Sequence, residues 1–145
     1  MLERLTVAGA PTPQGPYSSV VRAGDFLFVS GQGPVNAETG EMESEISVQE
    51  QTRLVLGHIR TILRGCGADL EDVVKCSVFL ADPRDFLAMN EVYGEVFGST
   101  KPARTTIAAS GQAGAAPAHA WDLPDPCAIR LTSPTYADIA SLCSL

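Results

Sequence analysis

One arginine of the sequence stands in a strand-like segment where it could bind an acid group. Arg104 belongs to the segment 101–108, whose β-branched residues favour a strand. A guanidinium binds a carboxylate through two parallel charge-assisted hydrogen bonds, which also orient the ligand. An arginine on a strand can equally form an ordinary, weak surface ion pair. The residue type alone therefore predicts either an anchor for a small acid or a surface ion pair.

Four further positions carry hydroxyl, amide or backbone groups that could contact the same ligand. Tyr17 follows a proline-rich loop, which could hold its ring over a cleft or pack the ring onto the core. Ser30 ends an apolar run just before Gly31, where its hydroxyl or the following amides could meet a ligand or only satisfy a turn. Asn90 is the polar member of an apolar helix face, so its amide needs a partner, either a ligand or neighbouring backbone.

The cysteines and histidines are not spaced for metal binding or redox chemistry. They are Cys66, Cys76, Cys127, Cys143, His58 and His119. The cysteines form no CxxC pair and have no nearby histidines, so we expect no metal site and no redox pair. We interpret Cys76, on the apolar face of a strand, as a core residue, because thiols are often buried as small hydrophobes.

Length, charge and hydropathy restrict the class of protein. With 145 residues the chain is long enough for one α/β domain with its own core. Its formal charge of -7, with ten scattered basic residues, argues against a nucleic-acid-binding surface. No apolar run of about eighteen residues could cross a bilayer. The N-terminus lacks the pattern of a secretory signal, so we expect a cytoplasmic protein without membrane partners.

The elements that must position these side chains follow from the hydrophobic pattern. Short strands are predicted at residues 3–7, 17–22 and 26–30, and the last two form a hairpin. Between the first two lies a loop, residues 10–16, whose three prolines leave it too rigid and too poor in donors for regular structure. Tyr17 then begins the hairpin and Ser30 ends it.

A long helix is predicted after the hairpin. Ser47 and Glu50 have the spacing of a capping box, in which each side chain accepts from the backbone of the other residue. Apolar residues then recur at intervals of three and four, which places one apolar stripe against a sheet. Gly65 and Gly67 provide C-terminal stops.

A strand, a second helix and a further strand follow this helix. Residues 73–80 alternate between apolar and other side chains and predict a strand. Asp82 and Pro83 open the second helix with a cap and a proline at its first position. Its inner face is expected to carry Phe86, Met89, Asn90, Tyr93 and Phe97. The strand that contains Arg104 comes next, at 101–108.

The C-terminal segment differs in composition from the rest of the chain. Alanine, glycine and proline dominate residues 111–126, which indicates a loop or linker. Alternation over 127–132 predicts a short strand, after which the pair at 133–134 could cap a terminal helix bearing Ile139 and Leu142. One hypothesis is that this segment has replaced an original C-terminus, for instance through a shifted reading frame.

Five separated segments together resemble the Rid family, the YjgF-like reactive-intermediate deaminases. The segments are Gly15-Pro16-Tyr17-Ser18, Val29-Ser30-Gly31-Gln32, Val78-Phe79-Leu80, Met89-Asn90-Glu91-Val92-Tyr93 and Lys101-Pro102-Ala103-Arg104-Thr105-Thr106. Five matches in the right order are more specific than one short motif. The resemblance spans residues 3–110, so we divide the chain into a Rid-like domain core at 1–110 and an atypical C-terminal segment at 111–145.

The resemblance implies a fold and an assembly. The fold is α+β, a ferredoxin-like or chorismate-mutase-like mixed sheet with two helices packed on one face. The assembly is a homotrimer with its ligand sites in clefts between subunits. A sheet with helices on one side leaves its other apolar face exposed, so burial of that face in an oligomer is physically sensible.

The resemblance also implies an activity, the hydrolysis of reactive 2-imino or enamine acids to 2-keto acids and ammonia without a cofactor. Substrates of the 2-iminobutanoate and 2-iminopropanoate type are expected. Arg104 would bind the substrate carboxylate and Tyr17 would share the catalytic role. The expected substrate-binding residues are Ser30, Gly31, Asn90 and Thr106.

Two departures from the family pattern leave the activity open. Family members carry a glutamate in a Val-Glu-Ile-Glu-like final strand, and this sequence has no such run. Thr106 stands where many members have cysteine, which matters less because the hydrolysis needs no thiolate. A catalytically weakened protein that still binds small carboxylates is therefore the alternative. A ribonuclease or translation inhibitor is less favoured, because the chain is acidic and has no basic aromatic surface.

Overall fold

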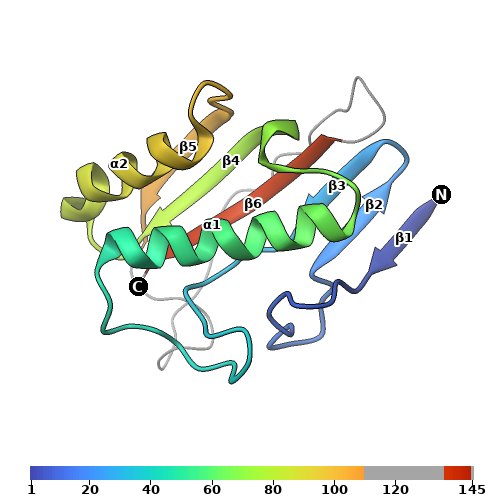
Figure 1. Ribbon diagram of the computed structural model, residues 1–145, viewed down its shortest axis with the longest axis horizontal. Helices are drawn as coiled ribbons and strands as arrows, with labels where there is room; N and C mark the ends of the chain where they lie inside the picture. Colours follow the sequence, from blue (N-terminus) through green and yellow to red (C-terminus); the bar gives the residue numbers. More distant parts are fainter. Residues whose placement is uncertain (110–135, 145) are drawn as a thin grey trace.

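A mixed β-sheet with two helices on one face is the architecture of the described residues (Figure 1). The computed structural model describes residues 1–109, and the backbone of residues 136–144. The strands are β1 (Leu2–Leu5), β2 (Val20–Ala23), β3 (Phe26–Val29), β4 (Val73–Leu80), β5 (Ala103–Ala108) and β6 (Tyr136–Ser144). The helices are α1 (Val48–Gly65) and α2 (Phe86–Phe97), with short 3-10 turns η1 (Leu70–Asp72) and η2 (Pro83–Asp85). The predicted fold class is confirmed.

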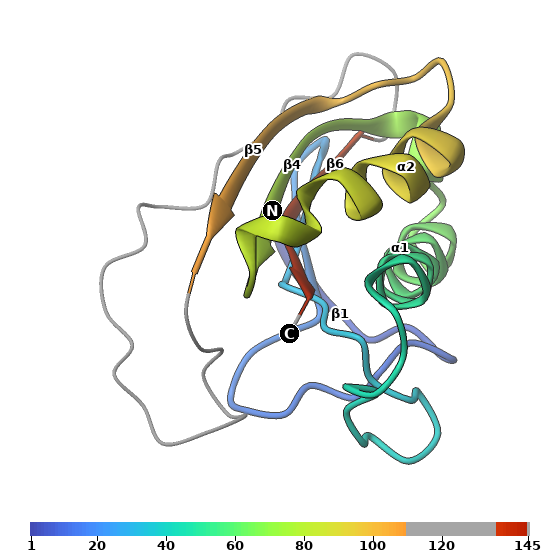
Figure 2. The ribbon, with the colours of Figure 1, turned by 90° about the vertical axis from the view of Figure 1, so that its left-hand side faces the viewer.

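The order of the strands explains why both helices cover the same face. The sheet runs β1-β2-β3-β6-β4-β5, with β1, β2 and β3 antiparallel to one another. β6 lies between β3 and β4 and is parallel to both, and β4 is parallel to β5. Parallel strands require crossovers, which α1 and α2 provide on one side of the sheet (Figure 2).

The start and the end of α1 agree with the sequence prediction. The Ser47 hydroxyl accepts from the Glu50 amide at 3.3 Å, and the Glu50 carboxylate accepts from the Ser47 amide at 3.0 Å, so the capping box is present. At the other end the helix stops at Gly65, and Gly67 adopts a left-handed conformation with φ of 82°. Glycine adopts this conformation without the steric cost that other residues meet there.

The core lies between α1 and the facing rows of β3 and β4. Val55 and Ile59 of α1, Leu27 and Val29 of β3, and Cys76 of β4 are each at most 1% exposed. The core position predicted for Cys76 is confirmed. No helix within the described ranges is long and apolar enough to span a membrane.

The prediction of a terminal helix is wrong. Residues 136–144, including Ile139 and Leu142, form β6 and pair with β3 and β4 on either side. Without this strand, β3 and β4 would each present unpaired backbone groups in the middle of the sheet, so pairing outweighs the weak local preference for a helix. The strand predicted at 127–132 lies outside the described residues.

Candidate functional site

Arg104 lies on the edge strand β5, in a row of residues that belongs to the helix-covered face of the sheet. It pairs in register with Cys76 of β4, which is fully buried in the core below the helices. Residues in register on neighbouring strands share one face of a sheet. Arg104 is therefore directed into the layer between β5 and α2.

The guanidinium of Arg104 contacts two aromatic rings of α2. Its Cζ atom is 4.5 Å from the centroid of the Tyr93 ring and 5.8 Å from the centroid of the Phe86 ring. Both distances lie within the range of cation–π attraction, about 6 Å. Within residues 1–109 the side chain of Arg104 forms no ion pair and no hydrogen bond. Its N–H groups are thus uncommitted in this part of the chain, and the surface ion pair considered above is not found there.

Three buried polar atoms around Arg104 also have no hydrogen-bond partner within the described residues. They are Oδ1 of Asn90, the hydroxyl oxygen of Tyr93 and Oγ1 of Thr106. Asn90 lies on α2 between Phe86 and Tyr93, and Thr106 follows Arg104 by two residues and so shares its face of β5. An unpaired buried polar atom costs about 1–3 kcal/mol. A bound ligand or water that paired with these atoms would remove that cost.

Tyr93 is part of the wall of this site and is held neutral. Its ring is 7% exposed and packs on Phe97, with the ring centroids 4.5 Å apart. Burial and the adjacent Cys76 thiol raise the pKa of the Tyr93 hydroxyl far above its ordinary value, although the cation of Arg104 acts in the opposite direction. We therefore treat Tyr93 as a neutral surface for the guanidinium.

Tyr17 and Ser30 are engaged in local contacts of the loop that joins β1 to β2. The Tyr17 hydroxyl accepts from the Gln14 amide at 3.1 Å, while the residue is 50% exposed. The Ser30 hydroxyl donates to the carbonyl of Ser18 at 2.6 Å, so it is paired across the β2–β3 hairpin and not within a local turn. Gly31 follows Ser30 and is exposed, so its backbone is accessible from solvent.

A single chain does not bring all predicted site residues together. Asn90 and Thr106 share the α2–β5 layer with Arg104. Strands β3, β6 and β4 separate β2, which follows Tyr17 in the chain, from β5, so β2 and β5 are about 19 Å apart at about 4.8 Å per strand. β3, which precedes Ser30, is about 14 Å from β5 by the same measure.

The backbone register shows which position of the final strand is in line with Arg104. This row continues from Arg104 through Cys76 to Ile139 of β6. Asp138, one residue before Ile139, pairs in register with Phe28 of β3 and Lys75 of β4 and so belongs to the next row. Among the described residues, no three His, Cys, Asp or Glu side chains are grouped so that they could hold a metal ion.

The sequence pattern placed Phe86 and Tyr93 on an apolar helix face but did not reveal their contact with Arg104. Their spacing of seven residues, about two turns of helix, puts them on one side of α2. Aromatic residues at this spacing on either side of Asn90 were the available signal. That signal does not identify the strand that the rings face.

Comparisons with known proteins agree with this architecture. Residues 7–117 match the protein family described as Endoribonuclease L-PSP. A RutC family protein of Pyrococcus horikoshii is 46% identical over 110 residues, which cover 76% of this chain and 86% of the relative. Reactive Intermediate Deaminase A, chloroplastic, of Arabidopsis thaliana is 41% identical over 104 residues, 72% of this chain and 55% of the plant protein.

Solved structures show the same fold. The crystal structure of TdcF from E. coli with bound serine superposes with a TM-score of 0.71 at 33% identity, covering 77% of this chain and 89% of TdcF. The Rid family protein YyfA of Yersinia pestis gives a TM-score of 0.74 at 30% identity, with 79% and 90% covered.

Proposed function

This chain belongs to the Endoribonuclease L-PSP family, which includes the Rid proteins, and from that membership we propose that it hydrolyses small 2-imino and enamine acids. The products are 2-keto acids and ammonia, and substrates of the 2-iminobutanoate and 2-iminopropanoate type fit best. The observation that carries the proposal is the guanidinium of Arg104, which is fixed against two rings and unpaired within the described residues. A relative named for reactive-intermediate deamination supports the same reaction.

Arg104 binds the carboxylate of the substrate in this proposal. The two oxygens of a carboxylate accept two parallel N–H groups of a guanidinium, and this pairing orients the reacting carbon as well as providing affinity. The neutral aromatic surroundings lower the local dielectric and strengthen the pairing. The charge that remains unpaired in the described structure is then neutralised by the ligand.

The buried atoms beside Arg104 are suited to the reacting groups. Water adds to the imine carbon and loses a proton, and the resulting carbinolamine expels ammonia as the keto group forms. Oδ1 of Asn90 can accept from the N–H of the iminium, which favours the protonated and more reactive form. The hydroxyl of Thr106 can accept a hydrogen bond from the attacking water or donate one to the new carbinolamine oxygen.

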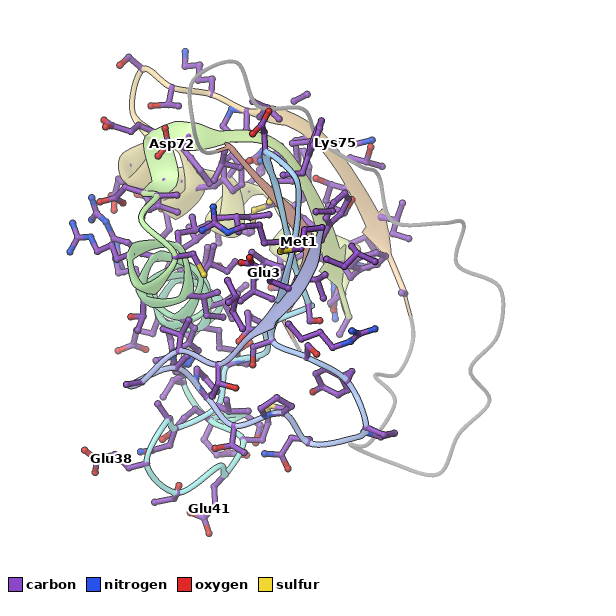
Figure 3. The ribbon with its side chains drawn as sticks, turned by 90° about the vertical axis from the view of Figure 1, so that its right-hand side faces the viewer. Met1, Glu3, Glu38, Glu41, Asp72 and Lys75 are labelled. Carbon is purple, nitrogen blue, oxygen red and sulfur yellow. The ribbon has the colours of Figure 1, made fainter. Side chains whose placement is uncertain are left out.

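We propose that a homotrimer completes the site with Tyr17, Ser30 and Gly31 of a neighbouring copy. The face of the sheet away from the helices carries half-buried apolar residues, among them Phe26 and Phe28, whose ring centroids are 6.1 Å apart. Lys75 of β4 also lies on this side (Figure 3). A second copy that covers this face would bury these rings and could bring the Tyr17 loop toward β5 of its neighbour.

The alternative is a protein that binds small carboxylates with little or no turnover. It is favoured by one observation, the absence of a carboxylate in the row Arg104, Cys76 and Ile139. In this row of the described strands, the water then finds no strong acceptor for its proton.

One pair of measurements separates the two functions. Release of ammonia is followed with freshly generated 2-iminobutanoate, and binding of the product-like acid 2-oxobutanoate is measured by calorimetry. Turnover that is well above the spontaneous rate supports the deaminase. Binding of 2-oxobutanoate without such turnover supports the carboxylate-binding protein, and the absence of both contradicts the site assigned to Arg104.

A further inference from the structure

We infer that Phe86 and Tyr93 form an aromatic clamp that holds the guanidinium of Arg104 in place for its ligand. Both are positioning residues, because they act through Arg104. The inference rests on the proposed function for the nature of the ligand, a small carboxylate. The clamp itself rests only on the contacts between α2 and β5.

The two rings of the aromatic clamp differ in exposure. Tyr93 is 7% exposed and is fixed by Phe97 behind it, so it forms a rigid wall. Phe86 is 39% exposed and lies at the start of α2, at the rim of the site. More than a third of the surface of Phe86 is open to solvent, whereas almost all of Tyr93 is covered. The guanidinium thus has one wall in the core and one wall at the solvent boundary.

The aromatic clamp compensates for the lack of polar partners. Arginine has several rotatable bonds, and restricting them on ligand binding is unfavourable in entropy. Within the described residues, no carboxylate or carbonyl group holds the Arg104 side chain. Attraction to two rings restricts it without using its N–H groups, which lie in the guanidinium plane and stay available for a carboxylate. The ligand then meets a cation that is already ordered.

Substitutions at the exposed ring test this role with little risk to folding. Phe86→Leu keeps an apolar side chain and removes the ring, and Phe86→Trp keeps an aromatic ring that attracts cations more strongly. We expect Phe86→Leu to weaken the Kd for 2-oxobutanoate about fivefold, the size of one partly exposed cation–π contact. Phe86→Trp is expected to bind 2-oxobutanoate with a Kd within about twofold of the parent value. Leu87→Ala is the matched control, because Leu87 is the adjacent residue and is 78% exposed.

Steady-state kinetics distinguish positioning from general damage. A looser anchor weakens the binding of the substrate and of the transition state alike, so KM should rise about fivefold in Phe86→Leu while kcat stays within about twofold. Equal Kd values for the parent, Phe86→Leu and Phe86→Trp would overturn the aromatic clamp. Equally weakened binding of 2-oxobutanoate by Phe86→Leu and Phe86→Trp would overturn the aromatic clamp as well.

A measurement without ligand separates failure of the aromatic clamp from failure of the proposed function. In a double-mutant cycle, unfolding by urea is compared for the parent, Phe86→Leu, Arg104→Met and the double variant at one protein concentration. The aromatic clamp predicts that Phe86→Leu lowers the urea midpoint less when Arg104 has already been replaced. Additive shifts would overturn the clamp even in an active enzyme. Coupled shifts in a protein that neither binds nor hydrolyses the acids would support the clamp and reject the proposed function.

Discussion

Replacing Arg104 by alanine is the most direct test of the candidate site. The substitution removes two charge-assisted hydrogen bonds to the substrate carboxylate, each about 1.5–3 kcal/mol. The loss of about 3–6 kcal/mol corresponds to a decrease in kcat/KM of roughly 10²- to 10⁴-fold. Few other contacts of the described residues can replace the anchor, because the neighbouring side chains on α2 are rings and a neutral amide.

The same substitution should leave the protein folded. It removes two cation–π contacts, with Tyr93 and Phe86, each about 0.5–1 kcal/mol at a partly exposed position. The resulting decrease of about 1–2 kcal/mol in the free energy of unfolding is small beside the roughly 5–15 kcal/mol typical of a domain. We expect Arg104→Ala to remain cooperative in thermal unfolding and to keep the oligomeric state of the parent.

The assay is ammonia release from freshly generated 2-iminobutanoate, with the spontaneous rate subtracted. Arg53→Ala is the matched control, because it removes a different arginine whose 3.0 Å ion pair with Glu95 is about half exposed on both sides. Such surface pairs contribute about 1 kcal/mol or less. The control should therefore retain the kcat/KM of the parent. A folded Arg104→Ala protein with kcat/KM within about threefold of the parent would refute Arg104 as the carboxylate anchor.

Three further predictions concern individual side chains. Thr106→Val removes a buried unpaired hydroxyl, so it should leave the free energy of unfolding unchanged or raise it by up to about 1 kcal/mol, while kcat should fall. A clear loss of stability would show that the hydroxyl is paired in solution. Ser47→Ala should cost about 1 kcal/mol in urea unfolding through loss of the capping box, and an unchanged midpoint would contradict this. Burial acts to raise the pKa of Asp69, but hydrogen bonds from the Leu70 amide and the Arg64 guanidinium prevail and lower it from 3.8 to about 2. Because the pKa of Asp69 is lower in the folded state, its stabilisation is complete above about pH 4 and is lost as the pH falls toward 2. Asp69→Asn should therefore flatten this part of the profile of stability against pH. Identical acid profiles for the parent and Asp69→Asn would contradict this prediction.

Local patterns in the sequence determined most of the secondary structure. The spacing of Ser47 and Glu50 predicted the start of α1, and the alternation over 73–80 predicted both ends of β4 as observed. These signals work because capping and periodic burial depend on residues close together in the chain. Residue type made Arg104 and Asn90 possible ligand contacts, whereas the resemblance to the Rid family favoured Arg104 as the anchor and added Thr106.

Tertiary structure decided the C-terminal strand and the surroundings of the anchor. The local pattern in residues 136–144 weakly favours a helix, and only the space between β3 and β4 requires a strand there. The contacts of Arg104 with Phe86 and Tyr93 arise because the crossover through α2 returns over β5, so residues from two elements meet. The sequence determines what chemistry each side chain can perform. Which side chains act together depends on how elements distant in the chain pack, and that packing is set by the burial and pairing of the whole sheet.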